Sequence, residues 1–236
     1  MIKQFLTSII MLASAAIAFS AQLKVPLRIM PLGDSITAGS YGNGLNGVGG
    51  YRAVLWSKCQ EAGLKVDFVG TWNDPTNATF DADHQGWRGG RTDQLAAEVQ
   101  PWLEQCHPDV ILLQIGVNDV IQGAEPSEIA ARLSRLLEVI NETAPKTQVY
   151  VASILGVLEP NDYHVPMKKV RDYNTLIPEV VSTQARKGSR MRFVDMNRLA
   201  AFEPSDFAAD HLHPSDSGYR KMAEVWFTTL KRSTRR

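Results

Sequence analysis

The chain has 236 residues, of which 44% are hydrophobic and 21% are charged, so it is long enough for one large globular domain with a substantial core. Its 25 Lys and Arg residues balance its 25 Asp and Glu residues, so it lacks the charge excess that binds nucleic acid or an anionic membrane surface. Its two cysteines, which form no Cys-x-x-Cys pair, exclude a disulfide framework and a structural zinc site of their own.

The N-terminal segment predicts a secretory signal. A short basic start precedes an uncharged apolar run over residues 5–19, which is shorter than the roughly 18–20 residues that cross a bilayer and suits a signal peptide. Small residues at its end fit cleavage after Ala18 or Ser20. We therefore expect a signal peptide over residues 1–20, one mature domain over residues 21–236 and a secreted, extracellular protein. The alternative is an anchor helix that the mature protein retains.

Secretion gives meaning to two further features. Asn77 and Asn141 each begin an N-glycosylation acceptor sequence, which would predict a glycoprotein if the cell is eukaryotic. Cys59 and Cys106 would lie in an oxidising compartment, but they fall in different predicted helices whose separation the sequence does not give. The pairing of the two cysteines stays open at this point.

From residue 27 onward, two hydrophobic periodicities alternate. Short, nearly continuous apolar runs predict strands buried on both faces, at Leu27–Leu32, Val66–Val69, Val110–Ile115, Val149–Leu155 and Met191–Val194. A helical pattern follows each of them, at Tyr51–Glu61, Gln94–Gln105, Glu128–Asn141, Lys168–Arg186 and Ser217–Leu230. Five strand-then-helix units predict a single-domain, three-layer α/β/α sandwich with a five-stranded parallel sheet between two layers of helices. Pro101 predicts a kink or a restart in the second helix.

Three polar motifs follow the first and third predicted strands and precede the last helix. They read Gly33-Asp34-Ser35-Ile36-Thr37, Gly116-Val117-Asn118-Asp119 and Asp210-His211-Leu212-His213-Pro214. Functional residues of open parallel sheets gather beyond the carboxyl ends of the strands. A serine there becomes a nucleophile when an imidazole takes its proton and a carboxylate orients that imidazole. His213 and Asp210 supply both groups, and the Asn118 amide, the Ser35 N–H and a glycine N–H would bind an oxyanion.

These residues resemble the GDSL/SGNH hydrolases, whose four sequence blocks supply a serine, a glycine, an asparagine and a histidine. The resemblance covers essentially the whole mature chain and implies the flavodoxin-like fold of these hydrolases. It implies that Ser35 is the nucleophile and that His213, oriented by Asp210, is the base. It also implies an oxyanion hole made by Ser35, Gly90 and Asn118, with no metal or organic cofactor.

Two positions need comment against the family pattern. Gly89 and Gly90 both fit the glycine block, and we assign Gly90 because the family's glycine opens the helix after the second strand. Ile36 stands where the motif has leucine, which is a conservative apolar change.

Local stretches are similar to carbohydrate esterase family three, a branch known for acetyl xylan esterases. They are residues 28–35, 50–52, 66–70 and 83–87. This resemblance implies a secreted enzyme that removes acetyl groups from plant polysaccharide. Its partner would be an acetylated polysaccharide or another small ester. We expect a monomer that binds no nucleic acid and, in its mature form, no membrane.

The residues assigned to catalysis could instead have purely structural roles. Asp34 and Ser35 are residue types that cap helices and turns through local hydrogen bonds, although the accompanying motifs favour catalysis. His211 competes with His213 for the role of base. Because His213 stands at the Asp-x-x-His spacing from Asp210, we assign the base to His213.

Asp34, His84 and Trp87 are further candidates, assigned to substrate binding. A structural hydrogen bond explains His84 equally well. Trp87 and Tyr163 fall in predicted loops and are candidates for stacking on sugar rings, whereas most aromatic residues belong to the core.

The segment 42–47 formally matches the dinucleotide fingerprint Gly-x-Gly-x-x-Gly. That motif requires a strand directly before it and a helix opening at the glycines, but here the first predicted strand ends at Leu32. We therefore interpret it as a loop near the substrate and expect no nucleotide cofactor.

Two other functions stay open. Fold and triad do not select the substrate, so a lipid or general acyl-ester hydrolase of the same superfamily is one alternative, although the sequence has no long apolar lid segment. A secreted protein that binds polysaccharide without cleaving it is the other. The complete set of serine, histidine, aspartate and asparagine speaks against that second reading.

Overall fold

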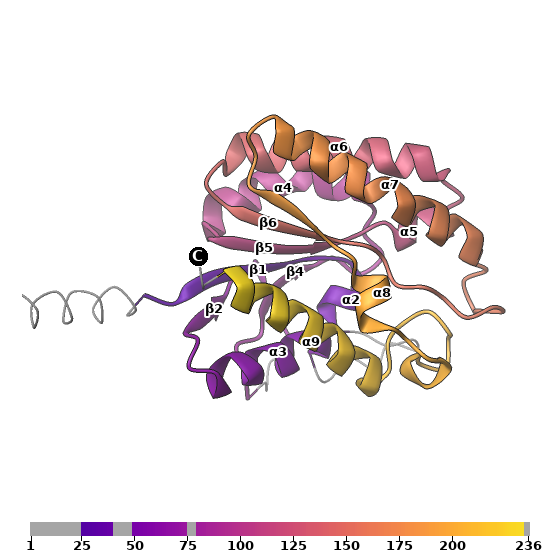
Figure 1. Cartoon of the computed structure of the whole chain (residues 1–236), viewed down its shortest axis with the longest axis horizontal. Coiled ribbons are helices and arrows are strands. Elements are labelled where there is room, and N and C mark those ends of the chain that lie inside the picture. The colour runs from indigo at the N-terminus through magenta and orange to yellow at the C-terminus, as the bar shows by residue number, and fades with distance from the viewer. Residues whose placement is uncertain (1–24, 40–48, 75–78, 234–236) are drawn as a thin grey trace, which may run out of the picture.

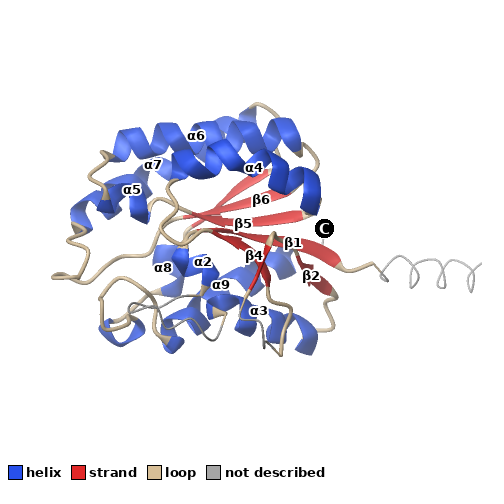
Figure 2. Ribbon diagram, turned by 180° about the vertical axis from the view of Figure 1, so that it is seen from behind, coloured by secondary structure: helices blue, strands red, loops and turns tan. Residues whose placement is uncertain are grey.

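A computed structural model describes residues 25–39, 49–74 and 79–233. A central sheet lies between two layers of helices (Figure 1, Figure 2). The strands are β1 (Leu27–Gly33), β2 (Val66–Phe68), β3 (Trp72–Asn73), β4 (Asp83–Gly86), β5 (Val110–Gln114), β6 (Gln148–Ala152) and β7 (Met191–Val194). The helices are α2 (Ser35–Ala38), α3 (Gly50–Glu61), α4 (Thr92–Cys106), α5 (Val117–Ile121), α6 (Pro126–Thr143), α7 (Met167–Arg186), α8 (Met196–Ala200), α9 (Asp216–Ser233) and the 3₁₀ helix Pro204–Asp206.

The parallel sheet expected from the sequence is confirmed. The strands pair in the order β2-β1-β5-β6-β7, and each of these pairs is parallel, which is the flavodoxin-like order. The sequence missed two short strands, β3 and β4, because their residues are largely polar and form no apolar run. β4 pairs with the end of β1, while β2 pairs with its beginning, and β3 runs antiparallel to β4.

The helices cover the two faces of the sheet separately. Helices α4, α5, α6 and α7 lie on one face, and α2, α3, α8 and α9 lie on the other (Figure 1, Figure 2). Cys59 belongs to α3 and Cys106 ends α4, so the sheet separates the two cysteines. Because a disulfide needs Cα atoms within roughly 7 Å of each other, the two cannot pair, and both thiols are free and buried.

Helix α6 illustrates how the apolar periodicity of the sequence produces a helix packed against the core. Its apolar positions recur on one face, and Ile129, Leu133 and Leu137 are fully buried against the core, each contributing roughly 1.5–3 kcal/mol. Pro126 stands in its first turn, and the Glu128 carboxylate accepts the Glu125 N–H in a capping box. Of the kink or restart expected at Pro101, the restart does not occur, because α4 continues through that residue as one helix.

Several sequence predictions lie outside the described residues. These are the signal peptide, the Asn77 acceptor and the glycine-rich segment 42–47. Asn141 lies in the last turn of α6, where its glycosylation stays a prediction. Among the described helices, none is long and apolar enough to cross a membrane.

Candidate active site

The turn from β1 into α2 presents Ser35 at the rim of the sheet. Gly33 ends the strand, and a Cβ there would lie 2.3 Å from the Gln114 carbonyl oxygen, so no larger residue fits. Asp34 caps α2 by accepting the Ile36 N–H at 2.9 Å. Ser35 therefore begins a short helix immediately after the strand, half-buried and turned toward the rim.

Asp34 does not line a substrate site. Its side chain is 1% exposed, so the assignment to substrate binding is wrong and the capping explanation holds for this residue. Burial raises the pKa of the Asp34 carboxyl to about 6, although the hydrogen bond from the Ile36 N–H acts in the opposite direction.

Ser35, His213 and Asp210 form one chain of hydrogen bonds. The Ser35 Oγ lies 2.8 Å from His213 Nε2, and His213 Nδ1 lies 2.6 Å from Asp210 Oδ2. An ionised carboxylate only accepts hydrogen bonds, so the imidazole carries its proton on Nδ1 and Nε2 accepts from the Ser35 hydroxyl. The arrangement can therefore take a proton from the serine.

Asp210 is held as an anion. Burial alone would raise the pKa of its carboxyl, but hydrogen bonds from the His213 ring and from the backbone N–H groups of His213 and Leu212 outweigh burial and hold that pKa below its usual range. The carboxylate is 2% exposed. It thus stays ionised beside the imidazole and fixes its tautomer.

His211, the rival to His213, serves the neighbouring loop. Its Nδ1 lies 2.7 Å from the Pro160 carbonyl oxygen. Backbone bonds also join the two segments, from Leu158 N–H to the His211 carbonyl and from Asp162 N–H to the Asp210 carbonyl. The loop between β6 and α7 is therefore fastened to the segment that carries His213.

That loop places the ring of Tyr163, a candidate for sugar stacking in the sequence, against His213 instead. The Tyr163 ring meets the His213 ring edge-on, with centroids 5.8 Å apart and planes at 70°. Buried Asn161 fixes the loop, because its amide donates to the Leu158 and Val165 carbonyls. Tyr163 thus forms one wall of the site. No local signal marks it, since the contact joins segments far apart in the chain.

The opposite side of the site is the turn between β4 and α4. The Asn118 amide, at the start of α5, donates to the Gly90 carbonyl at 2.9 Å, which leaves its second hydrogen available. The Gly90 N–H donates to the Trp87 carbonyl at 2.8 Å, so the assignment of Gly90 as an oxyanion donor is wrong. The N–H groups of Gly89 and Ser35 have no acceptor among the described residues. Gly89 is exposed with φ +74° and replaces Gly90 as the candidate.

Asp119 also holds the turn between β4 and α4 in place. Its fully buried carboxylate accepts the backbone N–H and the hydroxyl of Thr92, both at 2.9 Å. The other oxygen accepts from Arg132 at 2.7 Å. Two consecutive residues of α5 therefore hold the start of α4: Asn118 binds Gly90, just before the helix, and Asp119 binds Thr92, its first residue.

His84 holds strand β4 and does not face a substrate. It is fully buried, its Nδ1 accepts the Gly86 N–H at 3.0 Å, and its Nε2 lies 3.1 Å from Asp74. Burial lowers its pKa to about 3, and the nearby Arg52 charge acts in the same direction, so the ring is neutral near pH 7. The substrate-binding assignment of His84 is therefore wrong.

Trp87 packs at the edge of the sheet. Its ring lies edge-on to Trp72 and Trp102, with centroid distances of 6.5 and 6.1 Å, and it packs against the core. A sugar contact of the half-buried Trp87 stays a prediction.

The arrangement provides the parts that acyl transfer needs. It holds a hydroxyl hydrogen-bonded to an imidazole, a buried carboxylate behind that imidazole and, at Ser35 and Gly89, N–H donors without an acceptor among the described residues. Among the described residues, no group of three or more His, Cys, Asp or Glu side chains is placed to hold a metal ion.

A serine, imidazole and carboxylate joined in this way, at the carboxyl rim of a flavodoxin-like sheet, is the arrangement of a serine hydrolase. The chain belongs to the GDSL-like lipase/acylhydrolase family, whose model matches residues 32–221. The predicted superfamily is thereby confirmed.

Two curated relatives carry related sequences. The chain is 31% identical over 138 residues to a putative endoglucanase X of Acetivibrio thermocellus, covering 58% of this chain and 57% of that protein. It is 29% identical over 229 residues to a multidomain esterase of Ruminococcus flavefaciens, covering 87% of this chain and 28% of that protein. The matched region thus spans little more than half of one relative and under a third of the other.

Solved structures of carbohydrate esterase family 3 are similar to this chain, as the sequence predicted. A family 3 carbohydrate esterase of Clostridium thermocellum is 31% identical with a TM-score of 0.75, covering 89% of this chain and 99% of its own. A carbohydrate esterase family 3 protein of Talaromyces cellulolyticus is 27% identical with a TM-score of 0.75, covering 89% and 98%. These matches support the fold and the general class of the matched region, which is a carboxylic ester hydrolase domain.

Proposed function

We propose that this protein is a secreted esterase that removes acetyl groups from plant polysaccharide such as acetylated xylan. The observation that carries the proposal is the chain of hydrogen bonds from Ser35 through His213 to Asp210, 2.8 and 2.6 Å long. Support for an acetyl substrate comes from the family 3 carbohydrate esterases and from an acetyl esterase mutant solved with an acetate ion, which is 26% identical with a TM-score of 0.75.

In the proposed reaction, His213 Nε2 takes the proton of Ser35 as Oγ attacks the ester carbonyl carbon. The developing oxyanion accepts hydrogen bonds from the N–H groups of Ser35 and Gly89 and from the second hydrogen of the Asn118 amide. The imidazolium then protonates the leaving sugar oxygen, which leaves an acetyl group on Ser35. Asp210 stays ionised throughout and stabilises the imidazolium.

Water completes the cycle by the same groups. His213 takes a proton from a water molecule, whose oxygen attacks the acetyl carbonyl. The second tetrahedral intermediate then collapses as the imidazolium returns that proton to Ser35 Oγ, which frees Ser35 and releases the acetyl group as acetic acid. This chemistry needs no group beyond the side chains and N–H donors already described.

A Ser35→Ala variant tests the proposal against p-nitrophenyl acetate, p-nitrophenyl butyrate and acetylated xylan. We expect kcat on the acetyl substrates to fall by at least roughly 10⁴-fold, because the nucleophile is lost. Ser182→Ala is the matched control, since that hydroxyl bonds within α7, to Glu179 and Arg186, and we expect it to keep the wild-type rate.

Each contrary result has a meaning. A Ser35→Ala enzyme with the wild-type rate would overturn the proposed nucleophile. Wild-type preference for butyrate over acetate would favour a lipid or general acyl-ester hydrolase. Wild-type binding to acetylated xylan without release of acetate would favour a polysaccharide-binding protein.

A further inference from the structure

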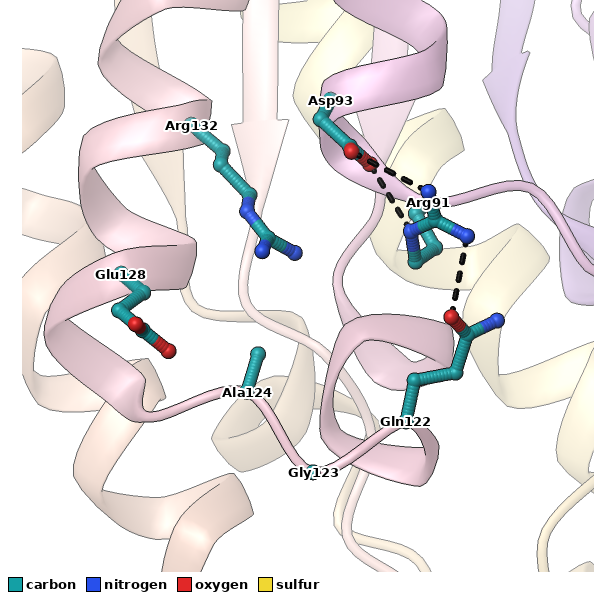
Figure 3. A pocket seen from close by; sticks show the side chains of 7 residues that line it. All are labelled: Arg91, Asp93, Gln122, Gly123, Ala124, Glu128 and Arg132. Atoms are coloured by element: carbon teal, nitrogen blue, oxygen red, sulfur yellow. Dashed lines mark hydrogen bonds and ion pairs between the residues drawn. The ribbon is translucent and has the colours of Figure 1, made fainter.

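A polar cavity of about 380 Å³ lies beside the turn that carries Gly89 and Gly90 (Figure 3). Its walls are the beginning of α4, the end of α5 and the beginning of α6. The volume falls within the roughly 300–1,000 Å³ typical of small-molecule sites. None of the residues assigned to the ester chemistry lines this cavity.

The cavity is connected to the proposed oxyanion site through α5. Gln122 follows Asn118 by one helical turn, with the Gln122 N–H bonded to the Asn118 carbonyl at 3.1 Å. The Asn118 side chain holds Gly90, and Gln122 Oε1 accepts from Arg91 at 3.0 Å. Gln122, in the wall of the cavity, therefore stands one helical turn along α5, roughly 5–6 Å of rise, from Asn118, whose amide would bind the ester oxyanion.

The lining leaves hydrogen-bonding atoms unused. Each guanidinium nitrogen of Arg91 makes one hydrogen bond, to Asp93 or to Gln122 (Figure 3). Arg132 reaches into the cavity and uses one nitrogen for Asp119. Among the described residues, no partner takes up the other guanidinium nitrogens of Arg132, the Gln122 amide nitrogen or the Glu128 Oε1. The cavity therefore offers both donors and an acceptor to a ligand.

Charge and polarity narrow the chemistry of that ligand. The guanidinium groups of Arg91 and Arg132 are balanced by the carboxylates of Asp93 and Glu128, so the cavity does not favour a free anion. Ala124 is its one apolar side chain, so an acyl tail would gain little from entering it. A neutral ring with several hydroxyl groups can both donate and accept, as this lining requires.

We propose that this cavity is a subsite for a sugar ring of the glycan chain, adjacent to the ring whose acetyl ester lies at Ser35. The subsite rests on the proposed esterase function and adds to it a place where the polysaccharide is recognised. Recognition beside the oxyanion site would distinguish an acetylated glycan from a small acetate ester that cannot reach the cavity.

The test is a double variant, Gln122→Ala with Glu128→Gln. Glutamine at 128 keeps an oxygen for the Glu125 N–H, so the cap of α6 is preserved. The matched control is Gln100→Ala with Glu104→Gln, an exposed pair that bonds at 2.8 Å on α4. The readouts are kcat and KM on acetylated xylan and on p-nitrophenyl acetate.

We expect the ratio of kcat/KM for acetylated xylan to kcat/KM for p-nitrophenyl acetate to fall about tenfold in the double variant, through a higher KM for xylan. Each lost hydrogen bond accounts for roughly a two- to tenfold loss. The control should keep the wild-type ratio. An unchanged ratio in the double variant would overturn the subsite alone. A wild-type enzyme that cleaves p-nitrophenyl acetate but no acetylated glycan would overturn both the glycan substrate and the subsite.

Discussion

At neutral pH, the buried carboxyl of Asp34 lowers the stability of the folded protein. The hydrogen bond that it accepts only partly offsets the effect of burial. It is fully buried next to the proposed nucleophile, and its pKa of about 6 lies well above the 3.8 of a solvated aspartate. Among the described residues, its carboxylate accepts a hydrogen bond from the Ile36 N–H. Ionising this carboxyl is therefore harder in the folded protein than in the unfolded chain.

Asp34→Asn should remove that cost. Below pH 3.8 the carboxyl is neutral in both states, and as pH rises toward 6 the unfolded chain ionises first, so the folded state loses stability. The difference of about 2 pKa units corresponds to roughly 3 kcal/mol. We therefore expect the free energy of unfolding of Asp34→Asn, relative to wild type, to increase by about that amount between pH 3.5 and pH 7.5 in urea titrations. A relative stability that does not change with pH would contradict the prediction.

Individual residues differed in how well the sequence predicted them. Ser35, Asn118 and the Asp210–His213 pair stand in motifs whose spacing is local. The hydrogen bonds join Ser35 to the pair, and the parallel pairing of β1 with β5 puts Asn118 at the same rim. His84 and Gly90 were misassigned because their roles depend on burial and on which N–H a turn consumes. Neither quantity is visible in residue type or spacing.

At the scale of elements, α5 joins the beginning of α4 to the core. Asp119 takes two hydrogen bonds from Thr92 and one from Arg132 of α6, directly after the residue that holds Gly90. The position of the proposed oxyanion donors therefore depends on Asp119, although its carboxylate is buried away from the rim.

Asp119→Asn should lower kcat for p-nitrophenyl acetate by roughly ten- to a hundredfold with little change in KM. Complete loss of an oxyanion donor costs about 2.7–4 kcal/mol, and here the donors are displaced but not removed. Thr92→Val, which deletes only the hydroxyl bond to Asp119, should act in the same direction with a smaller effect.

The control for this pair is Asp172→Asn, which breaks an exposed ion pair with Lys168 on α7 and should leave kcat unchanged. Melting temperatures separate loss of fold from loss of positioning, because Thr92→Val should melt close to wild type. Two results together would contradict the positioning role of Asp119. One is an unchanged kcat for Thr92→Val, and the other is a fall in the kcat of Asp119→Asn that its unfolded fraction fully explains.

At the scale of the whole molecule, the sheet keeps the two cysteines apart. Cys59 lies beneath the sheet in α3 and Cys106 above it in α4 (Figure 1). Burial raises the pKa of Cys59 to about 11 and also raises that of Cys106, so few thiolates form near neutral pH.

Thiol titration tests this arrangement directly. Protein unfolded in guanidinium without reductant should react with two equivalents of a thiol reagent per chain, whereas the folded protein should react slowly because both sulfur atoms are buried. The control is the same titration after reduction, which should give the same count. A reductant-dependent count would show a disulfide and overturn the separation of the two thiols.

The sequence by itself determined the layered parallel fold and the three motifs, because hydrophobic periodicity and motif spacing are local properties of the chain. Only the tertiary structure decided that Ser35 contacts His213, 178 positions away, and that the Tyr163 ring packs against His213. It also decided that the N–H of Gly89, and not that of Gly90, is available to an oxyanion, and that a polar cavity lies beside this turn. These depend on how loops from separate strands pack at one rim. That packing is fixed by the burial and hydrogen bonding of distant segments, which no single stretch of sequence records.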